Sequence, residues 1–236
     1  MPPSSDAPLL SRLRHADPDR FFCTIFAPPD KREALALLYL FNHELARARE
    51  VASEPVLALI RLQWWREVVE GERKKHDIAT PLSAALEAGW FEPEDLAGLI
   101  TARMAEADDI ADFPAFLAYA RGTGGRLARM AGKWLGADSP EVEDLGTAYA
   151  IAGILRARAY HARQGRSLLP VDGTAPDILA AHAEKLLTIQ PPRLALPAAL
   201  PAAFARRDLA RPTEVPHARS LWDRLAVLRS ALTGRV

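Results

Sequence analysis

Apolar residues recur three and four positions apart along residues 30–169, and this spacing constrains the fold more than any other feature of the sequence. Residues at that spacing share one face of an α-helix, whereas a strand places every second residue on one face. Alternating runs rich in β-branched residues, which indicate strands, are absent from this stretch. The sequence therefore predicts an all-α protein.

Prolines, glycines and short polar residues mark where the helices should begin and end. We expect Asp30 to cap the first helix of this stretch and Ser53 to cap the next one. Beyond Pro170 the helical pattern weakens, because prolines interrupt it repeatedly. The later helices are expected at residues 55–70, 81–88, 93–110, 113–135, 141–161 and 220–232.

Length and charge limit the organisation and the partners. A chain of 236 residues favours one domain over residues 1–236, and we expect residues 1–20 to be a flexible N-terminal segment. The 30 Lys and Arg residues balance the 30 Asp and Glu residues, so no excess of positive charge indicates nucleic-acid binding. We therefore expect no nucleic acid among the partners.

The hydropathy pattern bears on localisation. The first 22 residues contain no continuous apolar region of a signal peptide, and no later segment reaches the length of about 20 apolar residues that spans a membrane. We expect a cytoplasmic protein, with a peripheral membrane contact left open because an amphipathic surface would escape this test. The lone Cys23 is expected to be a small buried residue rather than a nucleophile.

Several segments resemble the squalene/phytoene synthase family. FF at 21–22, PPDKREA at 28–34 and LYLF at 38–41 are similar to the opening of that family. Residues 119–136 and 146–170 resemble its later helices, the last of them with the loop GRSLLP at its end. The resemblance implies a single-domain, isoprenoid-synthase-like helical bundle around a central cavity.

The acidic motifs of that family are missing. Where its first helix carries paired aspartates, this chain has Ala46 and Arg47, and only Glu50 remains acidic. Where the second motif carries an asparagine, an arginine, an aspartate and a glutamate-aspartate pair, this chain has Gly153, Arg156, Ala157, Tyr160 and His161. The resemblance thus implies a vestigial ligand-binding cavity with no catalytic residues, which Tyr39, His43, Ala46, Arg47, Glu50, Gly153, Arg156, Ala157, Tyr160, His161 and Arg166 would border.

The same substitutions bear on the metal. The enzymes of the family hold Mg²⁺ between carboxylates and diphosphate oxygens, and Mg²⁺ requires a nearly octahedral shell of oxygen ligands. Neither the Ala46 methyl group nor the Arg47 guanidinium can supply one. We therefore expect no metal and no cofactor in this protein.

Three other patterns have a structural explanation. DDIAD at 108–112 matches a diphosphate-binding DDxxD motif, but no second acidic cluster faces it, so we interpret it as solvated surface. His43, His161 and His182 are too scattered for a zinc site. Glycines at 122–125 lie in a helical pattern without a preceding strand, and close helix packing explains them better than a phosphate loop.

Arg47, Arg156 and Arg166 can act without a metal, because guanidinium groups pair directly with phosphate or carboxylate. An isoprenoid or lipid phosphate is the ligand this suggests. In the alternative interpretation, the arginines pair with Glu44, Glu50 or neighbouring acids and close the cavity.

Within the family, FNHELAR at 41–47, SE at 53–54 and QWW at 63–65 look closest to a mitochondrial branch, the synthase-like assembly factors of respiratory complex I. This implies a bacterial, non-catalytic binding or assembly factor, cytoplasmic or peripheral at the inner membrane, with a respiratory-complex subunit or an isoprenoid or lipid as partner. The alternative is a prenyltransferase that condenses two prenyl diphosphates with Mg²⁺ at an altered metal site. The oligomeric state stays open.

Overall fold

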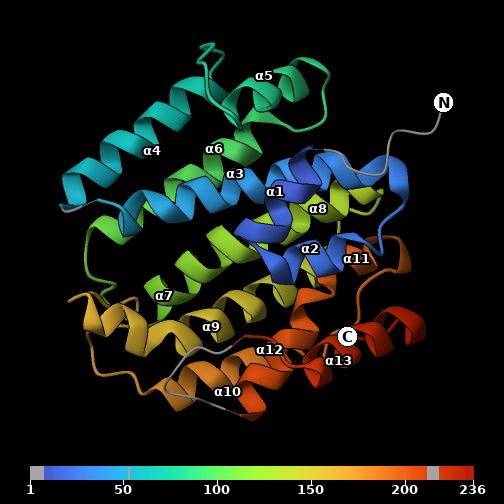
Figure 1. Ribbon diagram of the computed structural model, residues 1–236. Helices are drawn as coiled ribbons and strands as arrows, with labels where there is room; N and C mark the ends of the chain where they lie inside the picture. Colours follow the sequence, from blue (N-terminus) through green and yellow to red (C-terminus); the bar gives the residue numbers. More distant parts are fainter. Residues whose placement is uncertain (1–7, 53, 212–217) are drawn as a thin grey trace. The chain divides into compact units, whose positions relative to one another are not determined.

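The computed structural model describes residues 8–52, 54–211 and 218–236 (Figure 1). All regular elements within these ranges are helical, so the prediction of an all-α protein is confirmed. The helices group into two compact units, residues 1–107 and 108–236. The single domain expected over residues 1–236 stays a prediction.

The first unit is built around α3 (Arg32–Glu50), which contacts α1, α2, α4, α5 and α6. Residues 34–42 of α3 are buried without interruption, as expected of a helix that is covered on all sides. The other elements of this unit are α1 (Pro8–Ala16), α2 (Pro18–Thr24), η1 (Pro29–Lys31), α4 (Pro55–Val69), α5 (Ala79–Glu87), α6 (Pro93–Met104) and η2 (Ala105–Ala107).

The flexible segment expected over residues 1–20 is wrong from Pro8 onward. Leu9 and Leu13 are buried where α1 packs against α3, and this burial stabilises a helix too short to persist alone. Asp17 caps α2 by accepting a hydrogen bond from the Arg20 amide at 3.0 Å and pairs with the Arg20 guanidinium at 2.7 Å. Residues 1–7 lie outside the described part of the chain.

Two expected helix caps have different outcomes. Asp30 does not cap α3, because it lies within the 3₁₀ turn η1 and Lys31 stands at the N-cap position without a side-chain hydrogen bond. Ser53 lies outside the described residues. The predicted helix at 55–70 is present as α4 and begins at Pro55, where the missing N–H costs little.

The second unit is built around α9 (Pro140–Arg163), which contacts α7, α8, α10, α11, α12 and η3. The Ser139 hydroxyl accepts a hydrogen bond from the Val142 amide and caps this helix. The other elements are α7 (Phe113–Ala120), η3 (Arg121–Gly125), α8 (Arg126–Leu135), α10 (Pro176–Leu186), η4 (Arg193–Ala195), α11 (Leu196–Ala199), α12 (Pro201–Ala210) and α13 (Leu221–Thr233).

The helix predicted at 113–135 is interrupted by η3, a turn of π-helix that crosses α9 very closely. A Cβ added at Gly124 would lie 2.5 Å from the Ala150 Cβ, and one at Gly125 would lie 2.4 Å from the Thr147 hydroxyl. One at Gly146 would lie 2.4 Å from the Ala128 Cβ. The prediction that these glycines serve close helix packing is confirmed at Gly124 and Gly125, because a Cβ at either position would overlap atoms of α9.

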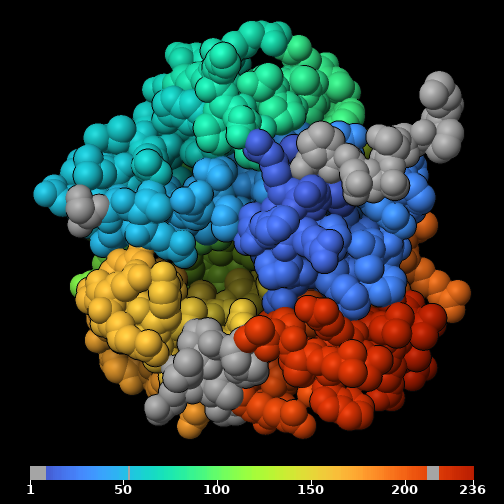
Figure 2. Space-filling model, viewed as in Figure 1, coloured from blue at the N-terminus to red at the C-terminus, as the bar shows by residue number. Residues whose placement is uncertain are grey.

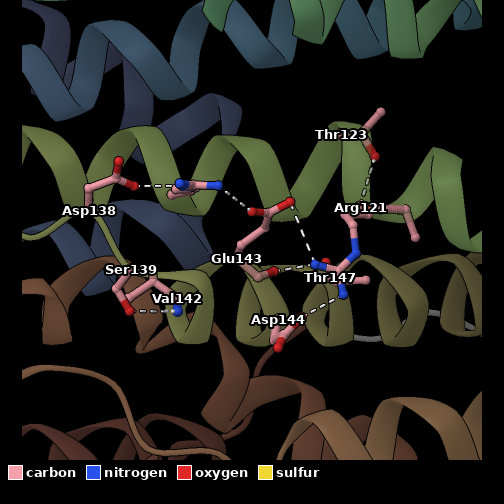
Figure 3. A network of polar contacts seen from close by, with 10 residues as sticks. Arg121, Thr123, Asp138, Ser139, Val142, Glu143, Asp144 and Thr147 are labelled. Carbon is pink, nitrogen blue, oxygen red and sulfur yellow. Dashed lines mark hydrogen bonds and ion pairs between the residues drawn. The ribbon is translucent and has the colours of Figure 1, made fainter.

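Ion pairs hold the two sides of this crossing together (Figure 3). Arg121 donates to Asp144 at 2.6 Å and lies 3.6 Å from Glu143. Arg129 donates to the other oxygen of Glu143 at 3.1 Å and to Asp138 at 2.6 Å. The N-terminal half of α9 is therefore fixed both by backbone approach and by charge, and its C-terminal half is the part that carries candidate site residues.

Candidate functional site

The candidate residues of the first unit share one face of α3. Tyr39, His43, Ala46, Arg47 and Glu50 recur at the four- and three-residue spacing of one helical stripe. Tyr39 is buried, His43 and Ala46 are partly exposed, and Arg47 and Glu50 are exposed. The stripe thus changes from apolar to charged toward the C-terminus of the helix.

The buried end of this stripe offers no base, and the exposed end is charged. Burial raises the pKa of the Tyr39 phenol above its usual range, with the Arg20 guanidinium 5.6 Å from the ring centre only partly opposing it, so Tyr39 is a hydroxyl and not a base. Arg47 lies 3.9 Å from the Glu44 carboxylate, which confirms the expected pairing in a long and solvent-exposed form.

The candidate residues of the second unit share a stripe on the last turns of α9. Gly153, Arg156, Ala157, Tyr160 and His161 lie three and four positions apart, and the chain then turns at Gly165. Tyr160 is exposed and the others are partly buried. The following loop places Arg166 close to this end of the helix, where it donates to the side chain of Gln164.

Arg156 is held by an acid that sequence reasoning did not identify. Its guanidinium lies 3.5 Å from the Asp208 carboxylate on α12, which also accepts a hydrogen bond from Arg219 at 3.0 Å. The Asp208 side chain is only 8% exposed, so its charge requires these partners. The prediction that Arg156 pairs with an acid is confirmed, but the partner comes from the proline-rich region where the sequence pattern was weak.

His161 and Arg166 line one pocket of about 390 Å³ at the end of α9. Arg158 joins them, and apolar residues from α9 and from the following loop form most of the remaining wall. None of the lining residues is acidic, so the pocket suits a ligand with one anionic group and an apolar part. The lining residues are Ile154, Arg158, Ala159, His161, Ala162, Arg166, Ser167, Leu168 and Leu169.

A second pocket of about 290 Å³ lies between α9, α10 and α12 and is lined in part by Arg156. Its lining carries the arginines Arg156, Arg158 and Arg211 and the acids Asp177, Glu184 and Asp208, so its charges balance. A pocket with balanced charges has less attraction for an anion than the pocket at the end of α9.

The residues present do not fit a magnesium cluster. The described part of the chain holds no group of three or more His, Cys, Asp or Glu side chains placed to bind a metal ion. The matched positions offer a methyl group at Ala46 and at Ala157 and a cation or imidazole at Arg47 and His161, none of which is an oxygen donor. No step that uses a metal follows from these residues.

The acids of the DDxxD string have other surroundings. Asp108, Asp109 and Asp112 are exposed, which confirms their interpretation as surface. Asp112 caps α7, because its carboxylate accepts a hydrogen bond from the Ala115 amide at 2.8 Å. The lone Cys23 is buried, as predicted.

Comparison with known sequences decides the family. The profile of the squalene/phytoene synthases matches residues 13–176 of this chain. The chain belongs to the squalene/phytoene synthase family. Its described residues include no helix that is both long and apolar enough to cross a bilayer.

Relatives in the family include complex I assembly factors. The mouse NADH dehydrogenase (ubiquinone) complex I assembly factor 6 is 28% identical over 180 residues, which are 72% of this chain and 54% of the relative. The human protein of that name is 27% identical over 173 residues, 69% of this chain and 52% of the relative. The chain thus spans about half the length of these relatives.

Solved structures of the family share the fold. A dehydrosqualene synthase determined with a ligand has a TM-score of 0.72 at 14% identity, with 96% of this chain and 94% of that chain covered. The squalene synthase of Alicyclobacillus acidocaldarius has a TM-score of 0.64 at 18% identity, covering 86% and 91%. The isoprenoid-synthase-like fold implied by the sequence is therefore confirmed.

Proposed function

We propose that this squalene/phytoene synthase family member is a non-catalytic binding and assembly factor, a bacterial counterpart of the proteins that assist respiratory complex I. One observation carries the proposal. The chain is similar to complex I assembly factor 6 over about 70% of its length, and it has no acid at Ala46, Arg47, Ala157 and His161. The peripheral contact with the inner membrane that the resemblance implies is part of this proposal.

The pocket at the end of α9 indicates what such a factor could hold. Two arginines and a histidine are gathered beside leucine and isoleucine side chains with no carboxylate among them. Guanidinium groups bind phosphate and carboxylate directly, so a metal is not needed to retain an anionic ligand. We propose an isoprenoid or lipid with an anionic head group as the ligand.

A turnover assay separates this proposal from prenyl transfer. The purified protein is incubated with farnesyl or geranylgeranyl diphosphate in Mg²⁺ or Mn²⁺, and released diphosphate is measured beside an authentic squalene synthase. We expect no release above the background without protein. Diphosphate release that depends on the metal and scales with protein concentration would overturn the hypothesis that the protein is non-catalytic.

Deletion of the gene in the source organism tests the assembly role. We expect less assembled NADH dehydrogenase on native gels, and restoration by the wild-type chain. Unchanged amounts of the assembled complex in the deletion strain would refute the assembly role while leaving the absence of catalysis untouched.

A pair of variants tests the pocket. Arg166 lines it, whereas the exposed Arg163 on the same helix end lines neither pocket. With farnesyl diphosphate as the probe in calorimetry, R166Q should weaken binding about tenfold, since a charge-assisted hydrogen bond contributes about 1.5–3 kcal/mol. R163Q should bind like the wild type. Equal affinities of the two variants would contradict the assignment of the pocket.

A further inference from the structure

The last helix, α13, presents its apolar side to solvent. Leu221, Leu225, Leu228 and Leu232 are all exposed, the last of them by 79%. The side that faces the protein carries Asp223, Val227 and Ser230. A helix on the surface of a water-soluble protein normally has the opposite arrangement, with its leucines packed against the protein. The exposed leucines therefore form a continuous stripe, which we call the leucine stripe (residues 221, 225, 228 and 232).

Polar contacts on the inner side fix this orientation. Ser220 and Asp223 form a capping box, and Arg207 on α12 donates to the Asp223 carboxylate at 2.6 Å. At the other end, the Arg206 guanidinium donates to the Val236 carbonyl at 2.8 Å. Because both ends are held, α13 cannot roll to bury the leucine stripe without breaking these contacts. Figure 2 shows this helix, in red, as uncovered surface of the second unit.

The residues that flank the leucine stripe are basic or aromatic. Arg224 lies on one side of it, and Arg229 and Trp222 lie on the other, with Trp222 exposed by 68%. The one acid of α13, Asp223, points inward to Arg207. The exposed charges of α13 beside the leucine stripe are thus both positive. Trp222 lies at the edge of the stripe, and tryptophan rings are enriched at membrane–water interfaces.

The arginines beside the leucine stripe also argue against its pairing with the same stripe of a second copy of the chain. The 4-3-4 spacing of the leucines is that of a coiled-coil seam, but α13 has 13 residues, fewer than two heptads, whereas such seams need about three or four. In a parallel pair, Arg224 of one copy would also face Arg229 of the other, and like charges repel. Self-association through this face is therefore unfavourable.

We propose that α13 docks this protein on an anionic bilayer, lying in the plane of the interface with the leucine stripe inserted among the acyl chains and the arginines at the head groups. This inference rests on the peripheral membrane contact of the proposed function and names the surface that makes it, whereas the assembly role is tested separately by the gene deletion. An anionic surface satisfies both features at once, since apolar burial and attraction of Arg224 and Arg229 act in the same direction.

Sedimentation with vesicles tests the proposal on the full chain. We expect binding to vesicles of phosphatidylcholine mixed with phosphatidylglycerol, little binding to phosphatidylcholine alone, and weaker binding at high salt. The variants L225Q/L232Q and R224Q/R229Q should each lower partitioning at least about tenfold. The control V171Q/L194Q changes two exposed apolar residues of the same unit outside α13 and should bind like the wild type.

Because these substitutions are at exposed positions, the wild type and the three double variants should have equal Tm values in thermal unfolding, which is measured beside the assay. Failure of the wild type to bind anionic vesicles, or equal binding by L225Q/L232Q, would overturn the proposal. So would a dimer in light scattering that L225Q/L232Q abolishes, or a protein partner that shields Trp222 in the absence of lipid, because either would show that the leucine stripe serves a protein interface.

Discussion

Replacing Gly146 by alanine should lower the stability of the second unit, because η3 and the first turn of α8 approach α9 at this residue. The new Cβ would lie 2.4 Å from the Ala128 Cβ and 2.5 Å from the Gly124 carbonyl oxygen. Carbon atoms in proteins reach their energy minimum about 3.5–4.0 Å apart, so the two helices must separate by about 1 Å. Neither neighbour can move aside by rotating a side chain, since one is a backbone oxygen and the other a Cβ.

The magnitude follows from two opposing contributions. Overpacking a core typically costs about 1–3 kcal/mol, and two contacts this short place Gly146→Ala at about 3 kcal/mol. Alanine gains about 1 kcal/mol over glycine in helix propensity, which leaves a net loss of about 2 kcal/mol. For a chain of this length, that loss should lower the Tm by roughly 4–8 °C.

Gly153 on the same helix provides the matched control. A Cβ at Gly153 meets nothing within 4 Å, so Gly153→Ala keeps the propensity gain without the clash and should raise the Tm by about 2–4 °C. Thermal unfolding followed by far-UV circular dichroism measures both variants. If Gly146→Ala melted at or above the temperature of Gly153→Ala, the close crossing of η3 and α9 would be refuted.

Three further changes test other contacts. Asp208→Asn should reduce the free energy of unfolding, measured in urea, by about 3–5 kcal/mol, because the nearly buried Arg219 side chain loses its carboxylate partner. Arg47→Gln should change the free energy of unfolding by less than about 0.5 kcal/mol, because the pair with Glu44 is exposed. Similar values for the two variants would contradict the role of Asp208. Asp112→Ala should lower the free energy of unfolding by about 1 kcal/mol, because α7 loses its N-cap. Asp109→Ala should change it by no more than about 0.5 kcal/mol. A larger loss for Asp109→Ala than for Asp112→Ala would contradict the capping role. Burial disfavours the charge on Asp223, but hydrogen bonds from Arg207 and Ser220 outweigh it and lower its pKa to about 2. Since the unfolded-state pKa is higher, ionised Asp223 should contribute about 2 kcal/mol above about pH 4 and lose this as the pH falls toward 2. Urea titrations across that range should therefore show the stability gap between wild type and Asp223→Asn closing, and a constant gap would count against the pairing with Arg207.

The helical elements of the central region were largely predictable because periodicity and helix-starting residues are local properties of the chain. Pro55 begins α4, and Ser139-Pro140 begins α9, as their sequence signals indicate. Gly124 and Gly125 were correctly assigned to close packing, although the turn of π-helix there was not foreseen. A π turn depends on the approach of α9, which is distant in the sequence, so no local pattern specifies it.

The candidate site was predictable only in part. The resemblance supplied the stripes on α3 and α9, and the pocket at the end of α9 brings together His161 and Arg166 from that set. Arg158, which joins them, was missed, because no position of the resembling motif pointed to it. Asp208 was missed because a single acid in a proline-rich region resembles any surface carboxylate until folding places it beside Arg156 and Arg219.

The order of the amino acids alone determined that this chain is helical, that it belongs with the squalene/phytoene synthases and that it has no carboxylates at positions 46, 47, 157 and 161. Only the tertiary structure decided which side of each helix packs against the rest of the protein. The leucine spacing of α13 would equally have predicted a buried face, and contacts of Asp223 and Val236 with arginines of α12 turn that face outward. Periodicity defines a stripe along a helix, whereas partners far away in the chain define whether that stripe is buried.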